Sequence, residues 1–78
     1  DMDAILDILE DLKPGEDYRS RTDLVDARVL DSLTILALVS ELEETFDIAI
    51  PAVEIVAENF NSLEGMWAMV CRLQEESF

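Results

Sequence analysis

Apolar residues recur at helical spacing in three separate stretches of this chain, and no stretch alternates between apolar and polar residues as a strand does. The first stretch predicts a helix over Asp3–Leu12, which Asp1 or Asp3 can cap and a Lys-Pro-Gly sequence ends. The second predicts a helix from Ser32 to Phe46, closed by Asp47, with one apolar stripe: Ile35, Leu38, Val39, Leu42 and Phe46.

The third stretch lies near the end of the chain, where Asn61 or Ser62 can cap a helix. Its predicted inner stripe is Leu63, Met66, Trp67, Val70 and Leu73. Pro51 suits the first position of a shorter helix of about two turns over Ala52–Glu58. These patterns predict an all-α protein, a small four-helix bundle of three main helices and one short helix, as one domain over residues 1–78.

The segment 13–31 is long for a connection in so small a protein, and long connections are often functional. We expect a short helical turn at 22–26, with Thr22 as its cap. Apolar side chains should hold the segment on the core: Tyr18, Leu24, Val25, Val29 and Leu30.

The net charge of −14 comes from 19 acidic and 5 basic residues. Leu, Ile, Val and Phe still make up one third of the chain, which is enough apolar surface to fold. Five cations cannot neutralise a row of phosphates, so nucleic acid is excluded as a partner, and an anionic membrane surface is disfavoured. The expected partner is a protein with a basic patch.

Several chemistries are excluded by residue type. The chain has no histidine, which removes histidine-based catalysis and zinc binding, and its one cysteine, Cys71, cannot form an internal disulfide. No Asp/Glu spacing matches a calcium loop, so we expect no metal site. No segment is apolar enough to span a membrane and no signal segment is apparent, so we expect a cytoplasmic monomer.

Two features at the predicted Ser32–Phe46 helix are candidates for function. Leu33 and Leu36 lie off the core stripe beside Glu43 and Glu44, an arrangement typical of a docking surface, although both leucines could instead pack under the long segment. Ser32 stands at the helix N-terminus, where free N–H groups favour a phosphate, although Asp31 or Ser32 could simply be a cap.

The residues around Ser32 carry a resemblance to a known family. Asp31, Ser32 and Leu33 begin the helix, LVSELEETFDI follows at 38–48, Ile-Pro at 50–51 and Glu-Asn-Phe at 58–60. The chain thereby resembles the acyl carrier and peptidyl carrier proteins over nearly its whole length. Leu30 replaces the glycine of many fatty-acid-synthesis carriers, and LVDARVLDS at 24–32 is closer to stand-alone carriers of the D-alanyl type.

The resemblance implies an acyl-carrier-like fold and a 4′-phosphopantetheine arm attached to Ser32, with Asp31 and Leu33 beside it. A phosphopantetheinyl transferase supplies the arm from coenzyme A, and the arm's thiol holds an acyl or aminoacyl cargo as a thioester. The protein is then no enzyme, because the reacting sulfur belongs to the cofactor. An adenylating or other loading enzyme and downstream acyl-transfer enzymes would dock at Leu36, Glu43 and Glu44.

The cargo stays open at this point between fatty acyl, aminoacyl and polyketide groups. The alternative function is that of an acidic helical interaction module that docks a basic partner and carries no cofactor.

Overall fold

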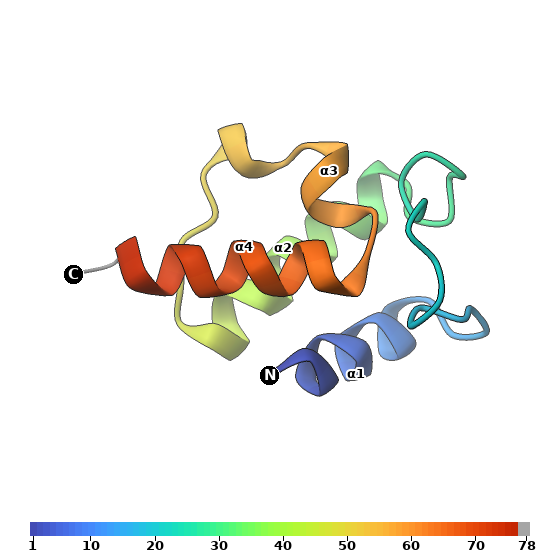
Figure 1. Cartoon of the computed structure of the whole chain (residues 1–78), viewed down its shortest axis with the longest axis horizontal. Helices are drawn as coiled ribbons and strands as arrows, with labels where there is room; N and C mark the ends of the chain where they lie inside the picture. Colours follow the sequence, from blue (N-terminus) through green and yellow to red (C-terminus); the bar gives the residue numbers. More distant parts are fainter. Residues whose placement is uncertain (77–78) are drawn as a thin grey trace.

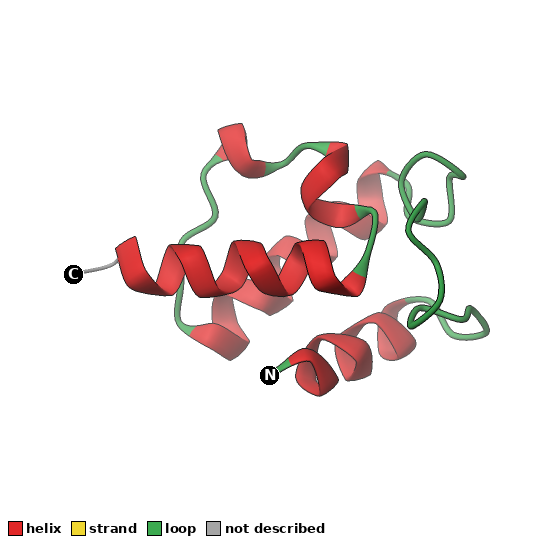
Figure 2. Ribbon diagram, viewed as in Figure 1, coloured by secondary structure: helices red, strands yellow, loops and turns green. Residues whose placement is uncertain are grey.

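The computed structural model describes residues 1–76, and every regular element in that range is helical (Figures 1 and 2). The predicted all-α architecture is therefore confirmed. In chain order the elements are α1 (Met2–Leu12), α2 (Ser32–Phe46), the 3₁₀ helix η1 (Ala52–Glu54), α3 (Ala57–Phe60) and α4 (Leu63–Glu76).

The ends of the first two helices follow from their capping residues. Asp1 caps α1 by accepting a hydrogen bond from the Ala4 N–H (3.0 Å), so the helix begins one residue earlier than predicted. The predicted bounds of α2 are confirmed, and Asp47 ends this helix in the left-handed conformation at φ 55°. Both caps are residue types that favour these positions.

The predicted helix over Ala52–Glu58 is wrong. The chain forms a single 3₁₀ turn after Pro51, becomes extended at Val56, and only then begins the four-residue helix α3. Three β-branched residues in this stretch, Val53, Ile55 and Val56, explain the break, because branched side chains lose rotamer freedom in a helix. The Asn59 side chain closes the break by donating to the Glu54 carbonyl oxygen (2.8 Å).

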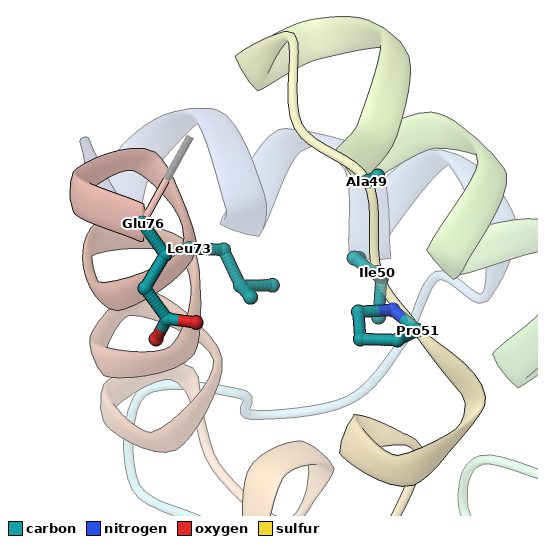
Figure 3. Close-up of a pocket in the computed structure, with 5 residues that line it drawn as sticks. All are labelled: Ala49, Ile50, Pro51, Leu73 and Glu76. Carbon is teal, nitrogen blue, oxygen red and sulfur yellow. The ribbon is translucent and has the colours of Figure 1, made fainter. Parts of the chain in front are cut away.

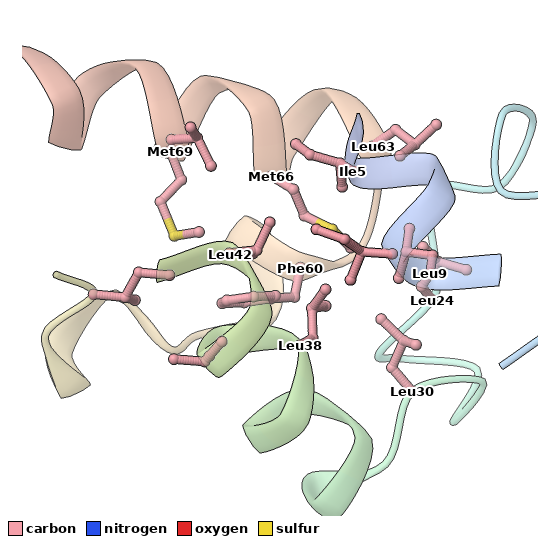
Figure 4. Packing of buried hydrophobic residues seen from close by; sticks show 14 of the residues in the cluster. Ile5, Leu9, Leu24, Leu30, Leu38, Leu42, Phe60, Leu63, Met66 and Met69 are labelled. Atoms are coloured by element: carbon pink, nitrogen blue, oxygen red, sulfur yellow. The ribbon is translucent and has the colours of Figure 1, made fainter. Parts of the chain in front are cut away.

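One hydrophobic core joins the helices, as Figure 4 shows for Leu38, Leu42, Phe60, Met66 and their neighbours. The inner stripe of α4 differs from the prediction in one respect. Met69 is fully buried, whereas Trp67 is only half-buried and packs its ring against Phe46, with centroids 6.0 Å apart. An indole can cover the edge of a core with its apolar body while its N–H stays near water.

The long segment 13–31 runs along one end of the bundle, from the end of α1 to the start of α2 (right in Figure 1). As predicted, its apolar side chains hold it on the core. Tyr18, Leu24, Val29 and Leu30 are buried, and Val25 is half-buried. The other described residues of this segment are half-buried or exposed, so a few apolar anchors fix its path.

The predicted turn at 22–26 lies about two residues further along and is not capped by Thr22. The Ala27 N–H donates to the Asp23 carbonyl oxygen (2.7 Å), and the Leu30 N–H donates to that of Leu24 (3.0 Å). The cap comes from the distant Asn61, whose side-chain oxygen accepts from the N–H groups of Val25 and Asp26. Sequence proximity favoured Thr22, and only the fold brings Asn61 to this turn.

Candidate functional site

Ser32 is the first residue of α2 and is exposed at the junction between the long segment and the helix. Asp31 performs the capping: its side chain accepts a hydrogen bond from the Thr34 N–H at 2.8 Å. Within the part of the chain that the structure describes, the Ser32 hydroxyl has no hydrogen-bond partner. The alternative that Ser32 is the helix cap is therefore wrong, and its hydroxyl is available to a reagent.

The charge state of Asp31 follows from the same contact. Its hydrogen bond from the Thr34 N–H lowers the pKa of the Asp31 carboxyl, and the positive charge of Lys13 lowers it further. A carboxylate with a lowered pKa is a weak proton acceptor at neutral pH. Asp31 is thus suited to hold the helix end rather than to activate the neighbouring serine.

Two surface hollows meet at Ser32, each of about 320 Å³. The first lies between α2 and the segment that precedes α3, and the second lies against the long segment. Three residues line both hollows: Val25, Ser32 and Ile35. The first is completed by Leu36, Ile55, Val56 and Ala57, and the second by Arg28, Leu30 and Asp31. A group attached to Ser32 would therefore emerge beside mainly apolar walls.

Asn61 fixes one of these walls. Its Oδ1 accepts from the Val25 N–H at 2.8 Å and from the Asp26 N–H at 3.1 Å, and its Nδ2 donates to the Asp26 carboxylate at 3.2 Å. Its backbone carbonyl accepts from the Leu24 N–H at 3.0 Å. The sequence indicated Asn61 only as a possible cap of α4, a position that Ser62 takes through the Gly65 N–H.

The predicted docking residues occupy different environments. Leu33 and Leu36 are 79% and 59% exposed, so neither packs under the long segment. Glu44 is exposed, but Glu43 is half-buried and accepts a hydrogen bond from the Ile50 N–H (2.8 Å). The structure therefore brings the two leucines and Glu44 to the open surface, whereas Glu43 holds the connection after α2.

Two further apolar side chains are exposed in the chain between α2 and α3, and neither was among the predicted docking residues. Val53 and Val56 are 77% and 41% exposed, and Val56 lines the first hollow together with Leu36. Their positions depend on the break in the predicted short helix. The available signal was the run of β-branched residues after Pro51, which disfavours a continuous helix.

A larger hollow of about 380 Å³ lies at the other end of α2 (Figure 3). Ile50 and Leu73 face each other across it, and Ala49, Pro51 and Glu76 complete its lining. Among residues 1–76, its lining has no nucleophilic side chain and one ionisable group, the carboxylate of Glu76. Size alone would favour this hollow, but the chemistry favours the one at Ser32.

The structure also bears on metal binding and membrane spanning. Within residues 1–76 no group of three or more Cys, Asp or Glu side chains is placed to hold a metal ion. In the same range no helix has the length and apolar character needed to cross a bilayer.

Comparison with known proteins identifies the class. A family model described as a phosphopantetheine attachment site matches residues 3–70. The chain therefore belongs to the family of phosphopantetheine-bearing carrier proteins, which hold a substrate on a covalently attached 4′-phosphopantetheine arm.

The similar curated proteins carry a more particular name. A D-alanyl carrier protein of Lactobacillus delbrueckii subsp. bulgaricus is 34% identical over 74 residues, covering 92% of this chain and 91% of the relative. A D-alanyl carrier protein of Lactococcus lactis subsp. lactis is 31% identical over 77 residues, covering 96% and 98%. No solved structure matched the chain.

The residues at Ser32 fit such an arm. The serine hydroxyl is exposed and has no capping role, and the two adjoining hollows leave room for a flexible chain. The first turn of α2 also directs its free N–H groups toward an anion at this position.

Proposed function

We propose that Ser32 is the attachment site of the 4′-phosphopantetheine arm and that the arm carries a D-alanyl group. The observation that carries the site assignment is the exposed Ser32 hydroxyl, left free by the Asp31 cap, inside the matched region. The name shared by the similar curated proteins supports the cargo.

The attachment reaction divides the work between two proteins. The Ser32 Oγ forms a phosphoester bond as the diphosphate of coenzyme A is cleaved, adenosine 3′,5′-bisphosphate leaves, and the serine proton passes to the transferase. This chain contributes an exposed nucleophile and a rigid helix end, and it supplies no catalytic group of its own. When bound, the arm supplies the thiol that holds the cargo as a thioester.

The packing of the core suits a small cargo. Leu38, Leu42 and Phe60 lie at the centre of the bundle and are at most 1% exposed, and the hollows at Ser32 open to the surface. An alanyl group at the end of a long arm needs no internal cavity. An adenylating ligase that activates D-alanine is the loading enzyme expected for this cargo.

The proposed docking surface for the transferase and the ligase consists of Leu33, Leu36, Val53, Val56 and Glu44. Leu36 and Val56 line one hollow with Ser32, and exposed apolar side chains gathered beside a reactive residue favour contact with a partner. With a net charge of −14, the chain would steer toward a partner surface that is basic. Glu43 was predicted from sequence as a further contact. We keep it as a partner contact at the edge of this surface, although its side chain also accepts a hydrogen bond from the Ile50 N–H.

The attachment site is tested by incubating the apo protein with coenzyme A, Mg²⁺ and a phosphopantetheinyl transferase, followed by intact and peptide mass spectrometry. Ser32→Ala should abolish the mass gain, and Ser40→Ala, which alters another exposed serine of α2, should leave it unchanged. Modification of the Ser32→Ala variant would refute the assignment.

The cargo is tested on the modified protein with ATP and an adenylating D-alanine ligase. Loading with D-alanine, much slower loading with L-alanine, and no charging by a ligase for long-chain fatty acids are the expected results. Efficient charging with a long acyl chain alone would refute the D-alanyl proposal while leaving Ser32 in place.

The docking surface is tested with two charge reversals. Glu44→Lys should slow loading mainly at low salt with little loss of stability, because Glu44 is exposed and its side chain has no hydrogen bond to any residue within 1–76. Glu43→Lys should also lower the unfolding midpoint, because it removes the acceptor of the Ile50 N–H. If both variants were loaded at the wild-type rate at every salt concentration, the partners would dock elsewhere.

A further inference from the structure

The five cations of this acidic chain fall into two groups. Arg19, Arg21 and Arg72 each form an ion pair with a carboxylate, at 2.8 to 3.1 Å. Lys13 and Arg28 form none with any residue in the range 1–76. Two of the five cations are thus without an ion pair in this range, although the chain has 19 acidic residues.

Both unpaired cations lie around the proposed attachment residue. Arg28 is exposed and lines the second hollow together with Asp31 and Ser32. Lys13 is half-buried and close enough to Asp31 for its charge to act on that carboxylate. Asp31 itself is occupied by the Thr34 N–H. Arg28 therefore lines this hollow without an ion pair among residues 1–76, and its positive charge remains available to an added anion.

We propose that the Arg28 guanidinium binds the phosphodiester that links the arm to Ser32. This inference rests on the proposed attachment at Ser32. A guanidinium presents several N–H donors in one plane and matches the oxygens of a phosphate better than a lysine ammonium does. The contact would hold the base of the arm beside α2 and leave its thiol end free to reach other enzymes.

The conformation of Arg28 provides an unusually clean variant. Arg28 has φ 62°, a left-handed conformation that a residue with a side chain adopts at a cost and glycine adopts freely. Arg28→Gly thus removes the guanidinium without disturbing the turn, and the unfolding midpoint should not fall. A loss of phosphate contact in this variant cannot then be attributed to a damaged fold.

The experiment uses the fully modified protein, with the mass gain mapped to Ser32 before any other measurement. The ³¹P resonance of the phosphodiester is followed from low salt to about 1 M salt, where charges are screened within roughly 3 Å. Arg19→Ala is the matched control. It removes one positive charge from the same long segment, at an exposed arginine that pairs with Asp3. Arg28→Lys keeps the charge and loses the planar donor set.

The ³¹P resonance of the wild type should move as salt is added. In Arg28→Gly the resonance at low salt should already lie near the wild-type high-salt position, and it should move by less than half as much. Arg19→Ala should behave as the wild type, and Arg28→Lys should be intermediate. The Arg28 Nε–Hε signal of the wild type should also shift between the apo and modified forms.

An unchanged Nε–Hε signal, or an Arg28→Gly protein with the wild-type ³¹P response, would overturn the role of Arg28 and leave the attachment at Ser32 intact. A mass gain mapped to another residue would overturn both proposals.

Discussion

Replacing Asn61 by alanine should release the turn that forms one wall of the site while leaving the helices in place. The side chain of Asn61 makes three hydrogen bonds across the fold, to Val25 and Asp26, which lie 35 to 36 residues away in sequence. The backbone bond between Leu24 and Asn61 survives the substitution. The variant therefore tests a side-chain contact rather than the whole connection.

The expected cost can be worked from these contacts. A hydrogen bond contributes about 0.5–1.5 kcal/mol net, and the two bonds to Asp26 are exposed and fall at the low end of that range. The part-buried bond from the Val25 N–H counts more, because its loss leaves a donor poorly solvated. Together they amount to about 2 kcal/mol, which lowers the midpoint of a domain of this size by about 8–16 °C.

The assay is amide hydrogen exchange, read segment by segment, with thermal unfolding in parallel. Asn59→Ala is the matched control, because Asn59 lies two residues earlier, in α3, and donates two hydrogen bonds to Glu54 instead. Asn61→Ala should speed exchange at residues 24–30 by more than the loss of global stability explains. Asn59→Ala should lower stability without this local effect.

Two results would refute the reasoning. Exchange that rises equally along the whole chain in Asn61→Ala would show that the side chain contributes only to global stability. Loosening of residues 24–30 by Asn59→Ala to the same extent would show that the turn responds to any weakening of the connection. In the expected case, attachment of the arm should also slow in Asn61→Ala, because Val25 lines both hollows at Ser32.

Three further predictions concern packing and charge. Leu42→Ala should cost about 2–5 kcal/mol in denaturant unfolding, because Leu42 is fully buried, whereas Leu36→Ala should cost little and slow cargo loading instead. The thermal unfolding midpoint should rise from low salt to about 0.1 M salt, because salt screens charges more than roughly 10 Å apart and so weakens repulsion in a chain of net charge −14. A flat profile would indicate locally paired carboxylates. The hydrogen bond from Arg72 lowers the pKa of Glu54 below its ordinary value of 4.5, so Glu54→Gln should reduce stability at neutral pH. That difference should persist above pH 4.5 and vanish as acid protonates Glu54, which a pH series of midpoints would show.

The helices could be predicted from the sequence where a local signal was strong. The bounds of α2 follow from an Asp cap, an apolar stripe and an Asp at the end, all within the helix or next to it. The prediction for 52–58 failed because it rested on Pro51 as a first helical residue, while three of the residues that follow are β-branched and disfavour a continuous helix. A start signal alone does not register that restriction.

The site residues also differ in whether their signal is local in the sequence. Ser32 and Asp31 could be found because the signal lies in adjacent residues at a helix start. Asn61 could not be assigned to the turn at 24–30, because its partners are brought near only by the packing of α3 and α4 against the long segment. The structural role of Glu43 was missed for a related reason, since its hydrogen bond depends on the path of the chain after Asp47.

These contacts explain how an exposed serine can be presented precisely by a segment with little regular structure. The long segment gains its position from four buried side chains and from Asn61, and neither device covers Ser32. If apolar burial alone fixed the segment, tighter packing would bring Ser32 closer to the core and hide its hydroxyl. The hydrogen bonds of Asn61 fix the turn through Val25 and Asp26 and leave Ser32 exposed. The stability of the fold and the contact with the arm can therefore be altered separately. Asn61→Ala should weaken the fold, whereas Arg28→Gly should leave the fold intact and lose the contact with the phosphodiester.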